Sequence, residues 1–434
     1  MPESSTPPTP ETQLSRRNLL GLVGVGAAGV ALGVGGTLGV DALTGGQHLF
    51  GAASLDGEKL QYDFFGEHQA GIVTPAQDRL HFAAFNMAEG STREDLISLL
   101  TDWTAAAEQL TQGKPIGATG AVDGPDDLPP DDTGEALGLG PSGLTLTFGF
   151  GPSLFEQNGV DRFGIASQRP DDLQALPRFF GDALEPEYTG GDLCVQACAN
   201  DPQVAVHAIR NLTRIAFGRA SLHWSQLGFG RTSSTSTAQA TPRNLFGFKD
   251  GTANIKAEEP KQLATSVWVN AEDQPAWLTG GSYLVARRIR MTIETWDHAQ
   301  LGEQERVFGR SKGSGAPLSG GTEFSEVNLA ATNAAGAPLI NPHSHVALAL
   351  PEQNDGAAML RRGYNYVDGN DALGRLNAGL FFLAYVRSPE QFITVQRSLA
   401  KDLMNEYTKH VGSAIFAVPP GAVAGSYVGA PLFS

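Results

Sequence analysis

Cysteine is scarce in this chain of 434 residues, which contains only Cys194 and Cys198. A count of two excludes the disulfide-dense scaffold of small secreted domains. The run 192–199 is apolar and predicts a strand, on which these two cysteines would lie too far apart to form a disulfide. We therefore expect two buried free thiols, with metal binding by the two sulfurs as the alternative.

Positive charge is also scarce, since 30 Lys and Arg residues stand against 46 Asp and Glu residues and give a formal net charge of -16. Binding of nucleic acid depends on clustered Lys and Arg side chains that neutralise phosphates. The sequence therefore argues against nucleic acid as a partner. Hydrophobic residues make up 41% of the chain, which predicts a globular protein rather than a disordered one.

The N-terminal segment carries two adjacent arginines, Arg16 and Arg17, before an uncharged run over residues 18–40. This pattern is typical of a twin-arginine export signal. The run is long enough to span a bilayer, but its many glycines lower its hydrophobicity and favour a signal over an anchor. We expect residues 1–54 to be signal and leader, recognised by the twin-arginine export machinery, and the protein to be periplasmic, extracellular or in the cell envelope. Because this route carries folded proteins, it favours a cofactor inserted before export.

The length predicts two domains, which we place at 55–235 and 236–434. A Ser-, Thr- and Ala-rich stretch, 231–243, connects them. In the first domain we expect strands at 79–87, 144–150 and 193–199, a helix that starts with a capping box at Ser91–Glu94, and a helix at 202–217. This order resembles a ferredoxin-like unit. In the second domain we expect strands at 282–295, 345–350 and 379–386 and a helix at 388–403, so the fold class is α+β with two ferredoxin-like domains and antiparallel sheets.

Three segments carry candidate functional residues. Asp250 lies between glycines in Gly247–Asn254, where a backbone could approach a ligand closely, although Asp-Gly is also a common turn. His345 begins an apolar run, as either a core histidine or an axial ligand of haem iron. Arg361 and Arg362 follow an apolar stretch and precede Gly and Tyr, either as surface arginines or as part of a site.

Together these segments resemble the dye-decolourising peroxidases, and among them the exported branch that includes the deferrochelatase/peroxidases. The runs 130–139, 149–152 and 307–312 add to the likeness, which extends from about Gln69 to the C-terminus. The resemblance implies two ferredoxin-like domains, with haem b (iron protoporphyrin IX) in the C-terminal one. It also implies hydrogen peroxide and small-molecule reductants, dyes among them, as substrates, and it leaves a homo-oligomer open.

The resemblance assigns roles to particular residues. Asp250 would be the distal acid and base, Arg361 the distal arginine and His345 the iron ligand, with Arg362 and His343 as the alternatives. The other residues expected at the haem are Gly251, Thr252 and Ala253 beside Asp250, Arg310 for a haem propionate, and Glu406, or else Asp402, as the carboxylate partner of the His345 ring.

The implied mechanism uses Asp250 to move a proton between the two oxygens of peroxide and Arg361 to stabilise the developing negative charge. An unperturbed aspartate titrates near ~3.9, which predicts turnover that is fastest on the acid side of neutral. Three other functions remain as alternatives: iron release from haem, non-catalytic haem binding after export, and chlorite decomposition.

Overall fold

The computed structural model describes residues 60–273 and 275–434, so the predicted signal and leader, 1–54, lie outside the described residues. The strands are β1 (Arg79–Met87), β2 (Thr145–Phe150), β3 (Leu193–Ala199), β4 (Ala220–Arg231), β5 (Ser282–Met291), β6 (Leu360–Arg361), β7 (Tyr364–Asn370), β8 (Leu376–Val386) and β9 (Thr408–Val418). The helices are α3 (Arg93–Thr111), α4 (Pro152–Phe155), α5 (Pro202–Ala216), α6 (Pro260–Ser266), α7 (Ile293–His298), α8 (Leu301–Phe308), α9 (His345–Ala349) and α10 (Pro389–Ser398).

The strands form one antiparallel sheet in the order β5-β9-β2-β3-β1-β4-β7-β8-β6, and β5 also pairs with β8. The N-terminal half contributes β2-β3-β1-β4, and the C-terminal half contributes β7-β8-β5-β9. When the four strands of each half are numbered along the chain, both halves have the spatial order 2-3-1-4. Both halves have the strand order of a ferredoxin-like unit, so the predicted α+β fold class is confirmed. The predicted boundary at 235 falls between β4 and α6.

The two halves meet edge to edge and close the sheet into a ring. β4 pairs with β7 at Phe229–Asn365, and β2 pairs with β9 at Phe150–Ala417. Apolar side chains from both halves fill the space inside the ring; among them are Leu80, Phe82, Trp224, Tyr364, Tyr366, Phe381, Tyr385 and Phe416. Cys194 and Cys198 are buried there as free thiols, as predicted.

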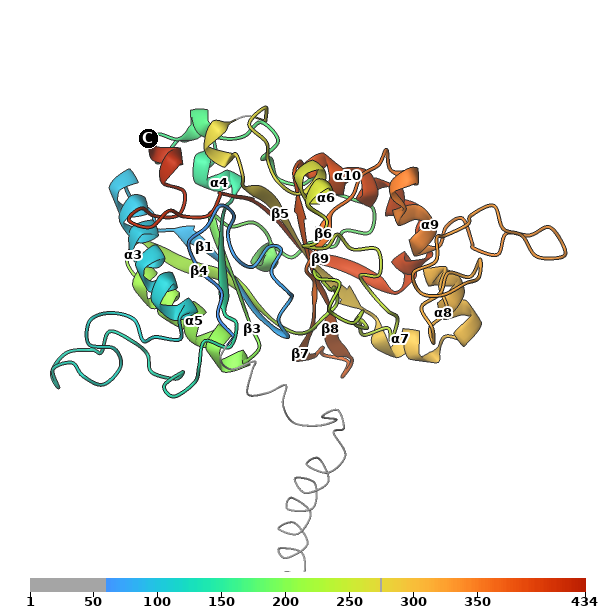
Figure 1. The fold of residues 1–434 in the computed structure, drawn as a ribbon, viewed down its shortest axis with the longest axis horizontal. Helices are drawn as coiled ribbons and strands as arrows, with labels where there is room; N and C mark the ends of the chain where they lie inside the picture. Colours follow the sequence, from blue (N-terminus) through green and yellow to red (C-terminus); the bar gives the residue numbers. More distant parts are fainter. Residues whose placement is uncertain (1–59, 274) are drawn as a thin grey trace, which may run out of the picture. The chain divides into compact units, whose positions relative to one another are not determined.

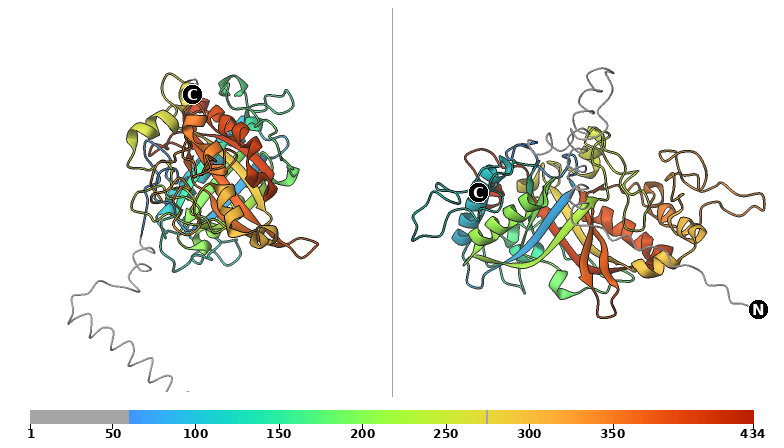
Figure 2. Two further views of the ribbon diagram at one scale, coloured as in Figure 1. Left: turned by 90° about the vertical axis from the view of Figure 1, so that its right-hand side faces the viewer. Right: turned by 90° about the horizontal axis from the view of Figure 1, so that it is seen from below.

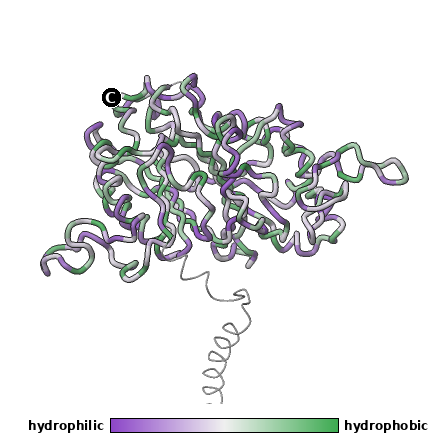
Figure 3. The backbone as a smooth tube through the Cα atoms, viewed as in Figure 1, coloured by the Kyte–Doolittle hydropathy of each residue, from purple (hydrophilic) through white to green (hydrophobic). Residues whose placement is uncertain are grey.

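Helices cover the outer faces of the ring differently in the two halves (Figure 1, Figure 2). In the N-terminal half, α3 and α5 lie side by side against the strands and bury Leu96, Leu100 and Trp103 of α3. In the C-terminal half, α10 and the short helices α7, α8 and α9 surround the outer face instead. Hydrophilic and hydrophobic residues are interspersed along both halves, as expected for helices that are apolar on one face (Figure 3).

Several predicted elements need correction. The predicted strand at 345–350 is wrong, because His345–Ala349 forms helix α9 between Ser344 at its N-cap and a C-cap before Pro351. A short apolar run does not distinguish a buried strand from one turn of helix. The capping box of α3 joins Thr92 to Asp95, one residue later than predicted. Among the described residues, no helix has both the length and the apolar character needed to cross a membrane.

Candidate active site

A cavity of about 310 Å³ lies on the outer face of the C-terminal half of the sheet. Ile289, Met291 and Phe382 form its apolar floor on the strands, and α8, α9 and α10 contribute Phe308, His345 and Val395. Seven of the residues predicted for the site line this one cavity: Asp250, Gly251, Thr252, Ala253, Arg310, His345 and Arg361. The fold therefore brings together segments that lie far apart in the sequence.

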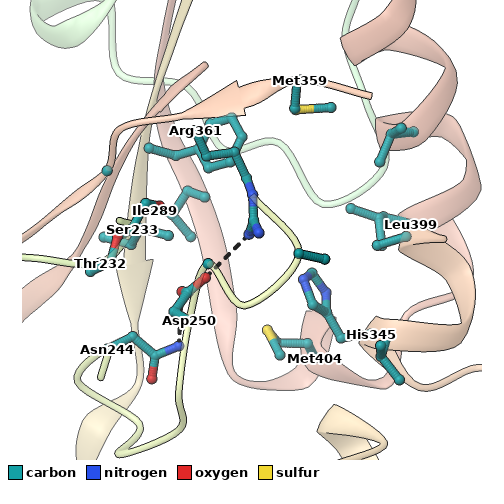
Figure 4. Close-up of a pocket in the computed structure, with 18 of the residues that line it drawn as sticks. Thr232, Ser233, Asn244, Asp250, Ile289, His345, Met359, Arg361, Leu399 and Met404 are labelled. Atoms are coloured by element: carbon teal, nitrogen blue, oxygen red, sulfur yellow. Dashed lines mark hydrogen bonds and ion pairs between the residues drawn. The ribbon is translucent and has the colours of Figure 1, made fainter. Parts of the chain in front are cut away.

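Asp250 and Arg361 form an ion pair on one side of the cavity, with Oδ1 of Asp250 3.2 Å from Nη1 of Arg361 (Figure 4). Both side chains are partly exposed to the cavity, at 18% and 26%. Asn254 fixes the backbone of Arg361, because its Oδ1 accepts from the Arg361 N–H at 2.7 Å and its Nδ2 donates to the Arg361 carbonyl at 2.9 Å. Gly251 has a φ of +80°, and a Cβ there would lie 2.8 Å from the backbone of Ser233, so only glycine fits beside Asp250.

The neighbouring Arg362 lies on the opposite face of the sheet, because side chains alternate along an extended strand. It is fully buried inside the ring, where Nη1 donates to the carbonyl of Thr74 at 2.5 Å and Nη2 donates to Gln77 Oε1. Burial lowers the pKa of Arg362, but the nearby Tyr364 and Cys198 raise it, and the net shift is upward. Of the two adjacent arginines, only Arg361 faces the cavity.

His345 lies across the cavity from Asp250 and Arg361, at the first position of α9 (Figure 4). Its Nδ1 is 2.6 Å from Oδ2 of Asp402, a buried carboxylate whose Oδ1 accepts from the Met404 N–H at 2.8 Å. Burial lowers the pKa of His345, but the carboxylate of Asp402 more than compensates and the pKa is raised. Since Asp402 occupies Nδ1, Nε2 is the ring nitrogen that can bind a metal.

The prediction of Glu406 as the partner of His345 is therefore wrong, and the alternative, Asp402, is correct. Asp402 caps the 3₁₀ turn Leu403–Glu406 and points inward, whereas Glu406 at the end of that turn is exposed and lies outside the cavity lining. His343, the alternative to His345, is also exposed and outside the lining.

Two family models cover most of the chain. The model for the N-terminal part of DyP-type peroxidases matches residues 69–230, and the model for the C-terminal part matches residues 241–423. The chain belongs to the DyP-type peroxidase family. It is 38% identical over 425 residues to the deferrochelatase of Escherichia coli strain K12, with 96% of each chain covered.

Solved structures agree with this assignment. The DyP-type peroxidase from Streptomyces coelicolor is 40% identical, matches with a TM-score of 0.80, and covers 87% of this chain and 98% of its own. Ferric DtpA from Streptomyces lividans is also 40% identical, with a TM-score of 0.80, and covers 89% of this chain and 100% of its own. DyP-type peroxidases depend on haem, so this family member is a haem peroxidase and an oxidoreductase.

The cavity of this DyP-type peroxidase fits a haem by the chemistry of its side chains. Within the described residues, no group of three or more His, Cys, Asp or Glu side chains could hold a metal ion. A single imidazole suits haem, because the porphyrin supplies the other nitrogen ligands to iron. The apolar floor suits the porphyrin faces, and Arg310 suits a propionate, since its Nη1 donates only to the backbone carbonyls of Gly315 and Glu323, at 2.8 and 2.9 Å. Burial lowers the pKa of Arg310, although the Glu323 carboxylate acts against this.

Sequence reasoning missed three residues that support the site. Asn244 donates to Asp250, and Asn254 holds the backbone of Arg361. Glu323 forms an ion pair with Lys249 and accepts from Thr252 Oγ1 at 3.2 Å, so it connects the 310–344 segment to the segment that carries Asp250. Asn254 could have been noticed, because it lies in the same short segment as Asp250; Asn244 acts through a local turn six residues before Asp250, and Glu323 acts through a contact that only the fold creates.

Proposed function

We propose that this DyP-type peroxidase uses haem b to reduce hydrogen peroxide and draws the electrons from dyes or other organic or metal donors. One observation carries the proposal: a carboxylate and a guanidinium 3.2 Å apart face an imidazole across an apolar cavity. The bound haem would supply the redox chemistry that cleaves the O–O bond.

The residues of the chain have distinct tasks in this proposal. The Asp250 carboxylate takes a proton from one oxygen of hydrogen peroxide and delivers it to the other oxygen, which leaves as water. The Arg361 guanidinium binds the peroxide and stabilises the negative charge that develops as the bond breaks. When haem is bound, His345 would hold its iron through Nε2, and Asp402 orients the imidazole ring. Arg310 binds a haem propionate.

The test is the reaction of the haem-loaded full chain with hydrogen peroxide, followed by the absorption spectrum of the haem. Replacing Asp250 with Asn removes the proton acceptor, so we expect the rate of the spectral change to fall by roughly 10²–10⁴-fold. The matched control is Asp126→Asn, at an exposed carboxylate in the 113–143 loop, which should react like the wild type. A chain that takes up no haem, or an Asp250→Asn variant as fast as the wild type, would contradict the proposal.

Iron release from haem is the second candidate, because the relative from Escherichia coli at 38% identity is named deferrochelatase. The two activities leave different products. Intact, metal-free protoporphyrin in the absence of peroxide turnover would favour iron release, whereas oxidised donor and unchanged haem would favour the peroxidase.

We also propose that the chain is exported by the twin-arginine route, because Arg16 and Arg17 precede the uncharged run 18–40. Replacing both arginines with lysine keeps the charge but removes the paired guanidinium groups. We expect the variant to remain in the cytoplasm with its haem bound, as measured by cell fractionation. Normal export of the variant would show that another signal is used.

A further inference from the structure

Asn244 opens a tight turn just before Asp250. Its Oδ1 accepts from the backbone N–H groups of Phe246 and Phe248, at 3.1 and 3.4 Å. Its own N–H donates to the Phe248 carbonyl at 3.0 Å, and its carbonyl accepts from Gly247 at 2.9 Å. Asparagine stabilises many turns through its side-chain oxygen in this way.

The same turn occurs twice more in the part of the chain that the structure describes. Asn333 Oδ1 accepts from Ala335 and Ala337, at 2.9 and 3.0 Å, and Asp371 Oδ1 accepts from Leu373 and Arg375, at 2.9 and 3.0 Å. The fourth residue of each turn is a glycine with a φ between +77° and +81°: Gly247, Gly336 and Gly374. Because Asp371 makes the turn with a carboxylate, the turn itself needs only the side-chain oxygen and does not require an amide.

The amide nitrogen of Asn244 is thus left for a second contact, and it donates to Oδ2 of Asp250 at 3.2 Å (Figure 4). The orientation of the amide is fixed, because its oxygen must face the two backbone donors. Asn244 is 8% exposed. Asp250 therefore has a donor on each oxygen, with Arg361 at Oδ1 and Asn244 at Oδ2.

We propose that Asn244 is a positioning residue that holds the Asp250 carboxylate towards Arg361 and the cavity, and that its amide, rather than its turn, is what the peroxide reaction requires. This inference rests on the proposed role of Asp250 as the proton carrier. Without the amide, only Arg361 would orient the carboxylate, and Oδ2 would be free to rotate away from the cavity. The charged groups around this carboxylate are Arg361 on β6, Lys249 beside it in the chain with its ion-pair partner Glu323, Arg310 after α8, and His345 on α9 across the cavity.

The Asn244→Asp variant of the haem-loaded full chain distinguishes the effect of losing the amide donor from the effect of losing the turn. The turn should survive, as it does at Asp371, but the donor is replaced by a second carboxyl group next to Asp250. Two adjacent carboxyl groups share a proton and do not both ionise readily. We therefore expect the pH at which the peroxide reaction is half-maximal to rise by about 1 unit or more, which lowers the rate about tenfold on the acid side. Haem content, the Soret band and the thermal midpoint should match the wild type.

The matched control is Asn333→Asp, which makes the same change in the same turn within a segment that does not line the cavity. It should leave both the pH profile and the thermal midpoint unchanged. A pH profile of Asn244→Asp that superimposes on the wild type would overturn the inference. So would a loss of thermal stability in Asn244→Asp that accounts for the lost rate. The Asp250→Asn variant distinguishes a failure of the proposed function from a failure of the positioning role. If Asp250→Asn reacts normally, the proposed function fails; if only Asn244→Asp reacts normally, the positioning role fails.

Discussion

The two halves of the ring have the same strand order but different outer faces. Helices pack closely over the N-terminal half, here called the filled half, whereas a cavity lies on the C-terminal half, here called the hollow half. Long helices of 19 and 15 residues, α3 and α5, cover the N-terminal half and pack it into a continuous apolar core. The C-terminal half has helices of 7, 6, 8, 5 and 10 residues, α6 to α10, which surround a cavity instead of filling it. A ferredoxin-like unit can therefore hold a cofactor when the helices over its sheet are too short to cover it.

This comparison predicts that changes in the filled half alter stability and leave the reaction intact, with the largest effect at Trp103. Trp103 is 1% exposed, and its Nε1 donates to the Leu212 carbonyl at 2.8 Å, which joins α3 to α5. Trp103→Ala should lower the free energy of unfolding by ~3–5 kcal/mol. Urea denaturation measures the loss, and Trp103→Phe, which keeps much of the packing, should lose less. A lower peroxide rate per bound haem in the folded variant would break the comparison.

Arg361 and Arg362 give the sharpest test of the hollow half, since they are adjacent in the chain but face opposite sides of the sheet. Arg361→Met should lower the rate of the peroxide reaction by about 10²–10³-fold, because a charge that stabilises the transition state is lost. Its thermal midpoint should change little. Arg362→Met should have the reverse effect, since it removes hydrogen bonds to Thr74 and Gln77 inside the ring. Stopped-flow spectra measure the peroxide reaction of both variants, and thermal melts measure their stability. Equal peroxide rates in the two variants would contradict the assignment of Arg361 to the site.

Asp402 and Glu406 provide a smaller contrast on the other side of the cavity. In Asp402→Asn the oxygen can still accept from Met404, but the new amide would donate to His345 Nδ1 and move the ring proton to Nε2. We expect haem affinity to fall by about 10–100-fold, measured as the rate of haem transfer to a scavenger protein. Glu406→Gln should retain haem like the wild type, because this side chain is exposed. If the two variants lost haem equally, the hydrogen bond between Asp402 and His345 would not be the cause.

The sequence predicted the parts of this molecule that depend on local pattern. Strands β1 and β2 alternate, β3 is apolar except for Gln196, and helix α5 repeats its apolar positions, so their bounds agree with the prediction to within about two residues. The prediction lacked β4, β7 and β9. Polar and glycine residues interrupt the alternation in β4, in β7 and in the first half of β9, and pairing with neighbouring strands holds these segments in the sheet.

The residues of the site likewise divide into those that a local pattern predicts and those that it does not. Asp250, Arg361 and His345 lie in segments that carry a motif, and the fold brings them to one cavity. The roles of Asp402 and Asn244 depend on where a short turn directs a side chain. A shift of four residues separates Asp402 from Glu406, and no periodicity in the sequence decides between them. Supporting residues of this kind become visible only when the contact that they make is known.

The smallest predicted effect concerns acid stability of the filled half, through His81 on β1. Burial lowers the pKa of His81 to about 4, and its Nδ1 has no hydrogen-bond partner among the described residues. The folded protein thus binds fewer protons than the unfolded chain, whose histidine titrates near ~6.5. The stability that the neutral ring provides is complete above this pH and is lost as the pH falls towards 4. His81→Asn should therefore flatten the fall of the thermal midpoint between these two pH values, whereas His298→Asn, at an exposed histidine, should not. If the filled half has no part in catalysis, the peroxide rate of His81→Asn at neutral pH will equal that of the wild type, and a changed rate would mean that the two faces of the ring are coupled.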